Sequence, residues 1–216
     1  MPKRALAAKR PYLLTSIVAA LTFYVLDGGP VGELWLALIK GAAIALLATY
    51  AWHRSHSKDV HLIAAVMAVA AIGDMVIEFY QVEGGAIFFL SHLVALGLYL
   101  QSHNRRSHLT GSQKAAALVL LLFTPLVAYL LAREWLVALY ALSLGAMAAA
   151  AWTSRFSRYH VGIGALLFVA SDFLIFASIG GSLQRTAALL VWPTYYVGQF
   201  LICTGVVQTL RRDHQA

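Results

Sequence analysis

The chain has 216 residues, of which 61% are hydrophobic and only 12% are charged, and its mean hydropathy is +0.75. A soluble domain carries about a quarter charged residues, so the composition excludes an ordinary soluble protein and indicates a polytopic membrane protein. The net charge is +7, but the basic residues gather in short connections, which points to membrane topology and anionic headgroups rather than to nucleic acid.

Eight apolar segments follow one another along the chain, and each is close to the length that a membrane-spanning helix needs, about 17 to 25 residues. The connections between them are short and polar, and no long polar stretch leaves room for a soluble domain. We therefore predict an all-α membrane protein with one eight-helix domain over residues 1–216. The predicted spans are Tyr12–Leu26, Leu34–Trp52, Val60–Phe79, Gly84–Leu100, Ala115–Ala132, Trp135–Trp152, Val161–Ile179 and Thr186–Leu210.

The basic residues predict the orientation of these spans. Of the 16 Lys and Arg residues, all but Lys40, Arg133 and Arg185 lie at the termini or in the connections after the second, fourth and sixth spans. Cytoplasmic loops carry the excess of Lys and Arg, so we predict that both termini are cytoplasmic, in a bacterial inner membrane. The basic N-terminus is followed by an apolar segment without a small-x-small cleavage site, which favours a retained first helix over a signal peptide.

Two acidic residues interrupt the apolar spans, Asp74 in the third and Asp172 in the seventh. An ionised Asp at the bilayer centre costs about 2.5–3.5 kcal/mol, so each must be paired, protonated or in a wet cavity. A functional role is the default expectation, and a structural bond to a neighbouring helix is the alternative. The Gly73-Asp74 and Ser171-Asp172 steps lie four spans apart, which also suggests a weak parallel repeat of four plus four helices.

Other polar residues accompany these acids. Glu78 shares a helix face with Asp74 by its spacing of four, but it lies at the edge of the span, where a solvated role is the alternative. Lys40 either extends its amine to the outer surface or pairs with one of the two Asp residues. His92 is either a core histidine bonded to a carbonyl or a proton carrier.

The last span contributes Tyr195, Tyr196 and Gln199, which supply hydroxyl and amide groups and serve either a site or helix–helix contacts. No HExxH, CxxC or GxSxG motif occurs in the sequence, so nothing predicts a metal, a cofactor or a serine nucleophile. The single cysteine, Cys203, excludes an intrachain disulfide.

Four stretches together resemble the YhhN family, which includes the animal lysoplasmalogenases: GDMVIEF, GGAIFFLSHLVALGLY, GALLFVASDFLIF and LVWPTYYVGQFLI. The family pattern has a Lys-Pro, a Gly-Asp, a Gly-x3-Phe-x3-His, a GAxxFxxSD block and a Tyr-Tyr-x-x-Gln. These elements fall on Lys40, on Gly73 and Asp74, on Gly84, Phe88 and His92, on Gly164 through Asp172, and on Tyr195, Tyr196 and Gln199. The chain departs from the pattern at Lys40-Gly41, where the family has Lys-Pro.

The resemblance implies an eight-helix membrane hydrolase of the vinyl-ether bond in lysoplasmalogens, which needs no cofactor and takes its lyso-lipid substrate from the bilayer. We expect Asp74 and Asp172 to meet in a shared pocket and to divide the acid and base roles. Lys40 and His92 would set their proton balance, and Tyr195 and Gln199 would position water or the glycerol oxygen. The alternatives are a proton-coupled transporter of a small solute or lipid, another intramembrane hydrolase or lyso-lipid hydrolase, and a non-catalytic lipid-binding protein.

Overall fold

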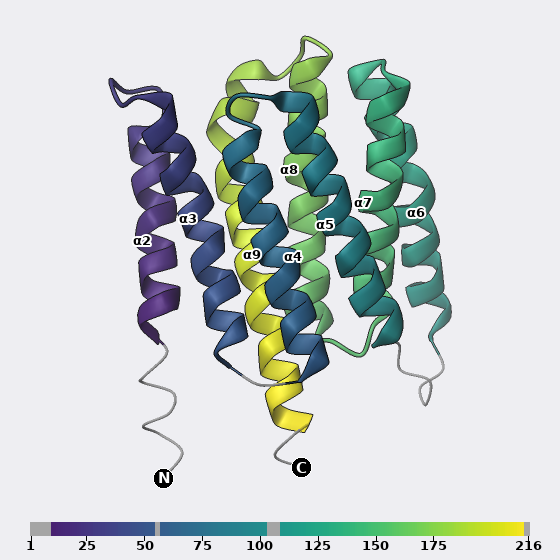
Figure 1. Ribbon diagram of the computed structural model, residues 1–216. Helices are drawn as coiled ribbons and strands as arrows, with labels where there is room; N and C mark the ends of the chain where they lie inside the picture. The colour runs from purple at the N-terminus through teal and green to yellow at the C-terminus, as the bar shows by residue number, and fades with distance from the viewer. Residues whose placement is uncertain (1–9, 55–56, 103–108, 214–216) are drawn as a thin grey trace. The chain divides into compact units, whose positions relative to one another are not determined.

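The computed structural model describes residues 10–54, 57–102 and 109–213, and these residues are almost entirely helical (Figure 1). A five-residue π-helical turn, η1 (Arg158–Gly162), leads directly into α8 (Ile163–Ile179). The elements are α2 (Arg10–Leu26), α3 (Glu33–Trp52), α4 (Lys58–Val76), α5 (Gln81–Gln101), α6 (Gly111–Ala132), α7 (Trp135–Thr153), η1 (Arg158–Gly162), α8 (Ile163–Ile179) and α9 (Gln184–Asp213).

Each segment predicted from the sequence corresponds to one of these helices, which confirms the all-helical fold. Some bounds differ: the span predicted to end at Phe79 ends at Val76, and the span predicted from Val161 begins within η1. Among the described residues, seven helices are long and apolar enough to cross a membrane. The first helix of the described residues, α2, is apolar but has only 17 residues. The chain is therefore an integral membrane protein, while the count of eight spans and the cytoplasmic termini stay predictions. Several of the basic residues behind that topology lie outside the described residues: Lys3, Arg4, Lys9, Arg105 and Arg106.

Local sequence explains where several helices begin and end. Thr110 accepts a hydrogen bond from the backbone N–H of Gln113, whose side chain reaches back to the N–H of Thr110, so a capping box starts α6. Arg133 ends the same helix in the left-handed region, with φ of 61°. The indoles of Trp35, Trp52 and Trp135 are exposed at helix ends, as expected for a belt of aromatic residues at the membrane interface.

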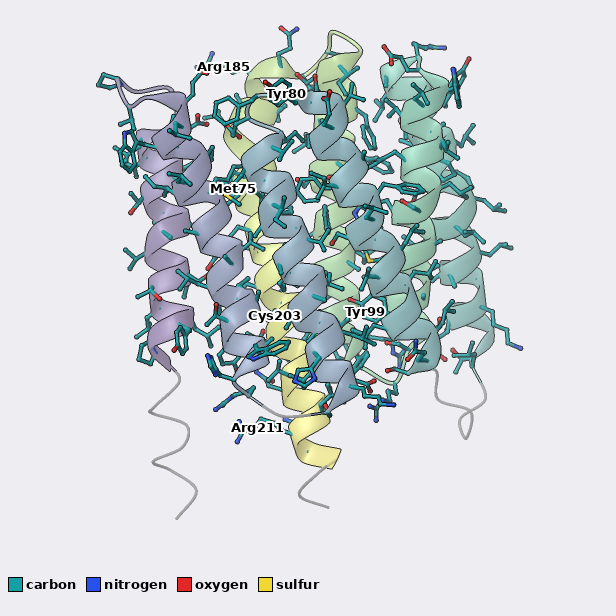
Figure 2. All side chains as sticks on the ribbon, viewed as in Figure 1. Met75, Tyr80, Tyr99, Arg185, Cys203 and Arg211 are labelled. Carbon is teal, nitrogen blue, oxygen red and sulfur yellow. The ribbon has the colours of Figure 1, made fainter. Side chains whose placement is uncertain are left out.

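The chain divides into two compact units, Met1–Ser91 with Leu210–Ala216, and His92–Thr209. In the first unit, α3 packs against both α2 and α4, and the three helices lie side by side in Figure 1. Ser16 of α2 donates a hydrogen bond to the carbonyl of Ala43 at 2.6 Å. On the other side of α3, a Cβ at Gly41 would lie 2.9 Å from the sulfur of Met75, which Figure 2 labels on α4. The glycine therefore permits the close approach of α3 and α4.

In the second unit, α6, α7 and α8 pack against one another, and α9 joins α8 through a pair of glycines. A Cβ at Gly164 would lie 2.8 Å from the carbonyl oxygen of Gly198, and a Cβ at Gly198 would lie 2.8 Å from that of Gly164. Lipid is as apolar as the helices, so small residues that let two backbones meet are a main source of helix association in membranes. This contact fixes α8, which carries Asp172, against α9, which carries Tyr195, Tyr196 and Gln199.

We predict that Gly164→Ala destabilises the protein by about 1–3 kcal/mol, because the added methyl group has no room between the two backbones. The loss is measured by thermal unfolding in detergent micelles. The matched control is Gly97→Ala on α5, where a Cβ meets nothing within 4 Å and alanine favours the helix by about 0.5–1 kcal/mol. Equal unfolding temperatures for the two variants would contradict the close α8–α9 contact.

Candidate active site

Asp172 of α8 is buried inside the second unit and has a phenol as its partner. Asp172 is 3% exposed, and the hydroxyl of Tyr140 on α7 donates a hydrogen bond to its Oδ2 at 2.8 Å. A carboxyl group inside a membrane span requires such a partner. The sequence predicted Asp172 as a site residue but did not single out Tyr140, which lies 32 positions earlier in a largely apolar helix.

The residue before Asp172 fixes the rotation of α8. Ser171 is fully buried, and its hydroxyl donates to the carbonyl of Val191 on α9 at 3.1 Å. Successive residues of a helix point about 100° apart, so Ser171 contacts α9 while Asp172 contacts α7. The turn of α8 that carries Asp172 is therefore held between α7 and α9.

His92 of α5 packs close to the same tyrosine. Its ring lies edge-on to the rings of Tyr140 and Phe168, with centroids 5.2 and 5.1 Å away. Its Nδ1 lies 3.3 Å from the hydroxyl oxygen of Ser143, one turn after Tyr140 on α7. Tyr140 consequently touches both Asp172 and His92, and it brings the two predicted residues into one cluster.

Helix α9 contributes the other predicted residues of this unit, and all three are buried. The ring of Tyr195 lies 5.2 Å from that of Phe168, edge-on, and Gln199 donates from Nε2 to the Tyr195 hydroxyl oxygen at 3.4 Å. Tyr196 stacks on Trp192 with centroids 5.9 Å apart. A continuous set of contacts thus runs from Asp172 through Tyr140, His92 and Phe168 to Tyr195.

The first unit holds Asp74, Lys40 and Glu78. Asp74 of α4 is 2% exposed. Lys40 of α3 forms an ion pair with Glu78, Nζ to Oε1 at 2.5 Å, between side chains that are 16% and 23% exposed. Its amine also lies 5.2 Å from the centre of the Phe23 ring. Glu78, which the sequence allowed as a solvated rim residue, is thus a half-buried ion-pair partner one turn beyond Asp74.

Asp74 belongs to the first unit and Asp172 to the second, so the shared pocket expected for the two acids stays a prediction. Across the parts of the chain that the structure describes, no group of three or more His, Cys, Asp or Glu residues is placed to hold a metal ion. The polar groups assembled in the second unit are those of proton transfer and hydrogen bonding, namely carboxyl, phenol, imidazole, hydroxyl and amide. The first unit contributes two carboxyls and an amine.

In a comparison with protein families, the YhhN family model matches residues 35–206. The chain belongs to the YhhN family. The matched region contains every site residue that the sequence predicted, from Lys40 to Gln199, and also Tyr140 and Ser143, which it missed. A search of curated proteins and a search of solved structures returned no match.

The Lys40–Glu78 ion pair of this YhhN protein predicts a coupled pair of substitutions. Lys40→Met or Glu78→Gln alone is expected to lower the free energy of unfolding by about 1.5–3 kcal/mol, since each removes a hydrogen bond to a charged group. The double variant should lose less than the sum, with an interaction energy of about 0.5–3 kcal/mol.

Thermal unfolding of the four proteins in micelles measures this coupling. Lys114→Met is the matched control, because Lys114 is an exposed cation near the start of α6. Strictly additive losses for Lys40 and Glu78 would contradict the ion pair.

Proposed function

We propose that this chain is a membrane-embedded hydrolase that cleaves the vinyl-ether bond of lysoplasmalogens. The products are a fatty aldehyde and glycerophosphoethanolamine or glycerophosphocholine. Membership of the YhhN family supports this proposal, because the family resemblance implies lysoplasmalogenase activity. The observation that carries it within the molecule is the buried carboxyl of Asp172, hydrogen-bonded to Tyr140 inside a span.

The reaction needs acid. A proton goes to the β-carbon of the vinyl ether, and an oxocarbenium ion forms at the carbon that bears the oxygen. Water then adds to this carbon, and the resulting hemiacetal breaks into aldehyde and alcohol. The chemistry therefore calls for one protonated carboxyl, which donates the first proton, and one ionised carboxylate, which stabilises the cation.

Asp74 and Asp172 divide these two roles in the proposed mechanism. Both are almost fully buried, and burial excludes the bulk water that would otherwise weaken their interaction with a developing charge. The Tyr140 hydroxyl holds Asp172 in place. Tyr195 and Gln199 bind the glycerol oxygen, with Tyr196 beside them, while Lys40 and Glu78 hold charge next to Asp74 in the first unit.

The lyso-lipid enters from the bilayer, because the substrate and the protein share the same membrane. The proposed location is the bacterial inner membrane, where short basic connections attract anionic headgroups on the cytoplasmic side. Side chains and water are sufficient for the proposed reaction, so we propose no cofactor.

We predict that Asp74→Asn and Asp172→Asn each lower aldehyde release from a lysoplasmalogen by about 10²–10⁴-fold, since an amide can neither donate nor accept the proton. The assay uses purified protein in mixed micelles and follows the aldehyde by mass spectrometry. Asp27→Asn, at an exposed carboxylate beyond the end of α2, is the matched control and should retain full activity.

Turnover that survives in a folded Asp74→Asn/Asp172→Asn double variant would reject the carboxyl mechanism. A wild-type protein that releases no aldehyde, but takes up a solute into liposomes with protons, would instead favour the transporter. Release of a fatty acid rather than an aldehyde from a panel of lyso-lipids would favour an ester hydrolase.

A further inference from the structure

One nitrogen of the His92 imidazole has a hydrogen-bond partner, and the other has none among the described residues. The residue is 1% exposed, and its Nδ1 contacts the hydroxyl of Ser143 at 3.3 Å. Its Nε2 is buried and has no hydrogen-bond partner among the described residues. A buried polar nitrogen without a partner is rare in folded proteins and requires an explanation.

The hydrogen bonds of Ser143 determine which nitrogen of His92 carries the proton. A serine hydroxyl has a single hydrogen, and Ser143 donates it to the backbone carbonyl of Tyr140 at 2.7 Å, the shorter of its two contacts. Its oxygen can then only accept from His92, so Nδ1 must carry the hydrogen. In the neutral ring this leaves Nε2 as a bare acceptor with a free electron pair.

Neither of the two described rings that pack on His92 can supply the missing donor. The Phe168 ring has no polar hydrogen, and the hydroxyl hydrogen of Tyr140 is committed to Asp172 at 2.8 Å. A second proton on Nε2 would not solve the problem, because a charged donor without an acceptor is more costly to bury than a neutral acceptor. The nitrogen is therefore satisfied by a small neutral group that brings its own hydrogen-bond donor, such as an O–H.

We propose that Nε2 of His92 binds the water molecule that attacks the substrate and removes its proton, which makes His92 a catalytic residue. This inference rests on the proposed hydrolase function. Asp172 suits the role of base less well, since the hydrogen bond from Tyr140 occupies an electron pair of its carboxylate. The free imidazole supplies the base, and the carboxylate is left to stabilise the cation.

The protons balance through the cycle. The acidic carboxyl gives its proton to the β-carbon, and the water oxygen bonds to the oxocarbenium carbon while Nε2 takes one of its hydrogens. The resulting hemiacetal gives its hydroxyl proton back to the carboxylate that donated the first one. As the bond from carbon to the glycerol oxygen breaks, the imidazolium of His92 passes its proton to that oxygen, and both groups return to their starting states.

The test combines kinetics with ¹⁵N NMR of the histidine ring in the wild-type protein, assigned through the signal that disappears in His92→Gln. We expect a protonated Nδ1 and a bare Nε2. We also expect His92→Gln to lower kcat by about 10²–10⁴-fold with little change in KM. Ser143→Ala should mix the two tautomers in the NMR spectrum and lower kcat about tenfold, since it removes only the group that orients the ring.

Ser91→Ala is the matched control. Ser91 is a buried serine that precedes His92 and donates to the carbonyl of Val66 at 3.1 Å, so its loss should change neither the tautomer nor kcat. The two serine variants also keep the proposal testable if His92→Gln fails to fold.

Two O–H groups could bond to Nε2, that of water and the free hydroxyl of the lyso-lipid, and a substrate analogue distinguishes them. If His92 binds the free hydroxyl of the lyso-lipid instead of water, an analogue with a methoxy group there will make wild type and His92→Gln equally slow. That result would overturn the assignment to water. A hydrogen found on Nε2 in the resting protein, or an unchanged kcat in a folded His92→Gln variant, would also overturn it. If the wild-type protein releases aldehyde but the His92 results differ from those expected, only the role of His92 is rejected and the proposed function is retained. If the wild-type protein releases no aldehyde, both the proposed function and the role of His92 are rejected.

Discussion

A polar side chain in the hydrocarbon layer has no water to bond, so it must find its partners within the protein. This constraint explains most polar contacts of both units. Ser16 and Ser91 each return a hydrogen bond to a carbonyl of a neighbouring helix, and Tyr140 satisfies Asp172. Among the described residues of the second unit, the exceptions are the Nε2 atom of His92 and the hydroxyls of Tyr99 and Ser102. Of these three, only the Nε2 atom belongs to the cluster around Asp172 and Tyr140.

Glycine contacts between helices make this polar arrangement possible. A hydroxyl such as that of Ser171 reaches only a carbonyl on an adjacent helix, and it does so because α8 and α9 approach closely at Gly164 and Gly198. Small residues therefore set the distance between backbones, and short polar side chains then fix the rotation of each helix. Packing and polar bonding are two parts of the same solution in a membrane protein.

The sequence predicted the helices well because apolar length is a direct signal of a membrane span. It also identified Asp172 and His92, since a charged or titratable residue stands out in an apolar segment. It missed Tyr140 and Ser143, because tyrosine and serine occur in many spans without a functional role and only the packing of α7 brings them to Asp172 and His92. The ion pair of Lys40 with Glu78 was also missed, since the sequence offered Lys40 only the outer surface or one of the two Asp residues.

The bond between Ser171 and α9 has a consequence for how this protein can respond to charge. Because Ser171 ties one side of the helix turn and Tyr140 holds the carboxyl on the other, Asp172 cannot swing away when a neighbouring group becomes positive. The Tyr140 hydroxyl and the Asp172 carboxyl already point in a fixed direction, so they stabilise such a charge with little reorganisation. The helix turn at Ser171 and Asp172 therefore holds the carboxyl in one orientation, which keeps its electrostatic effect constant.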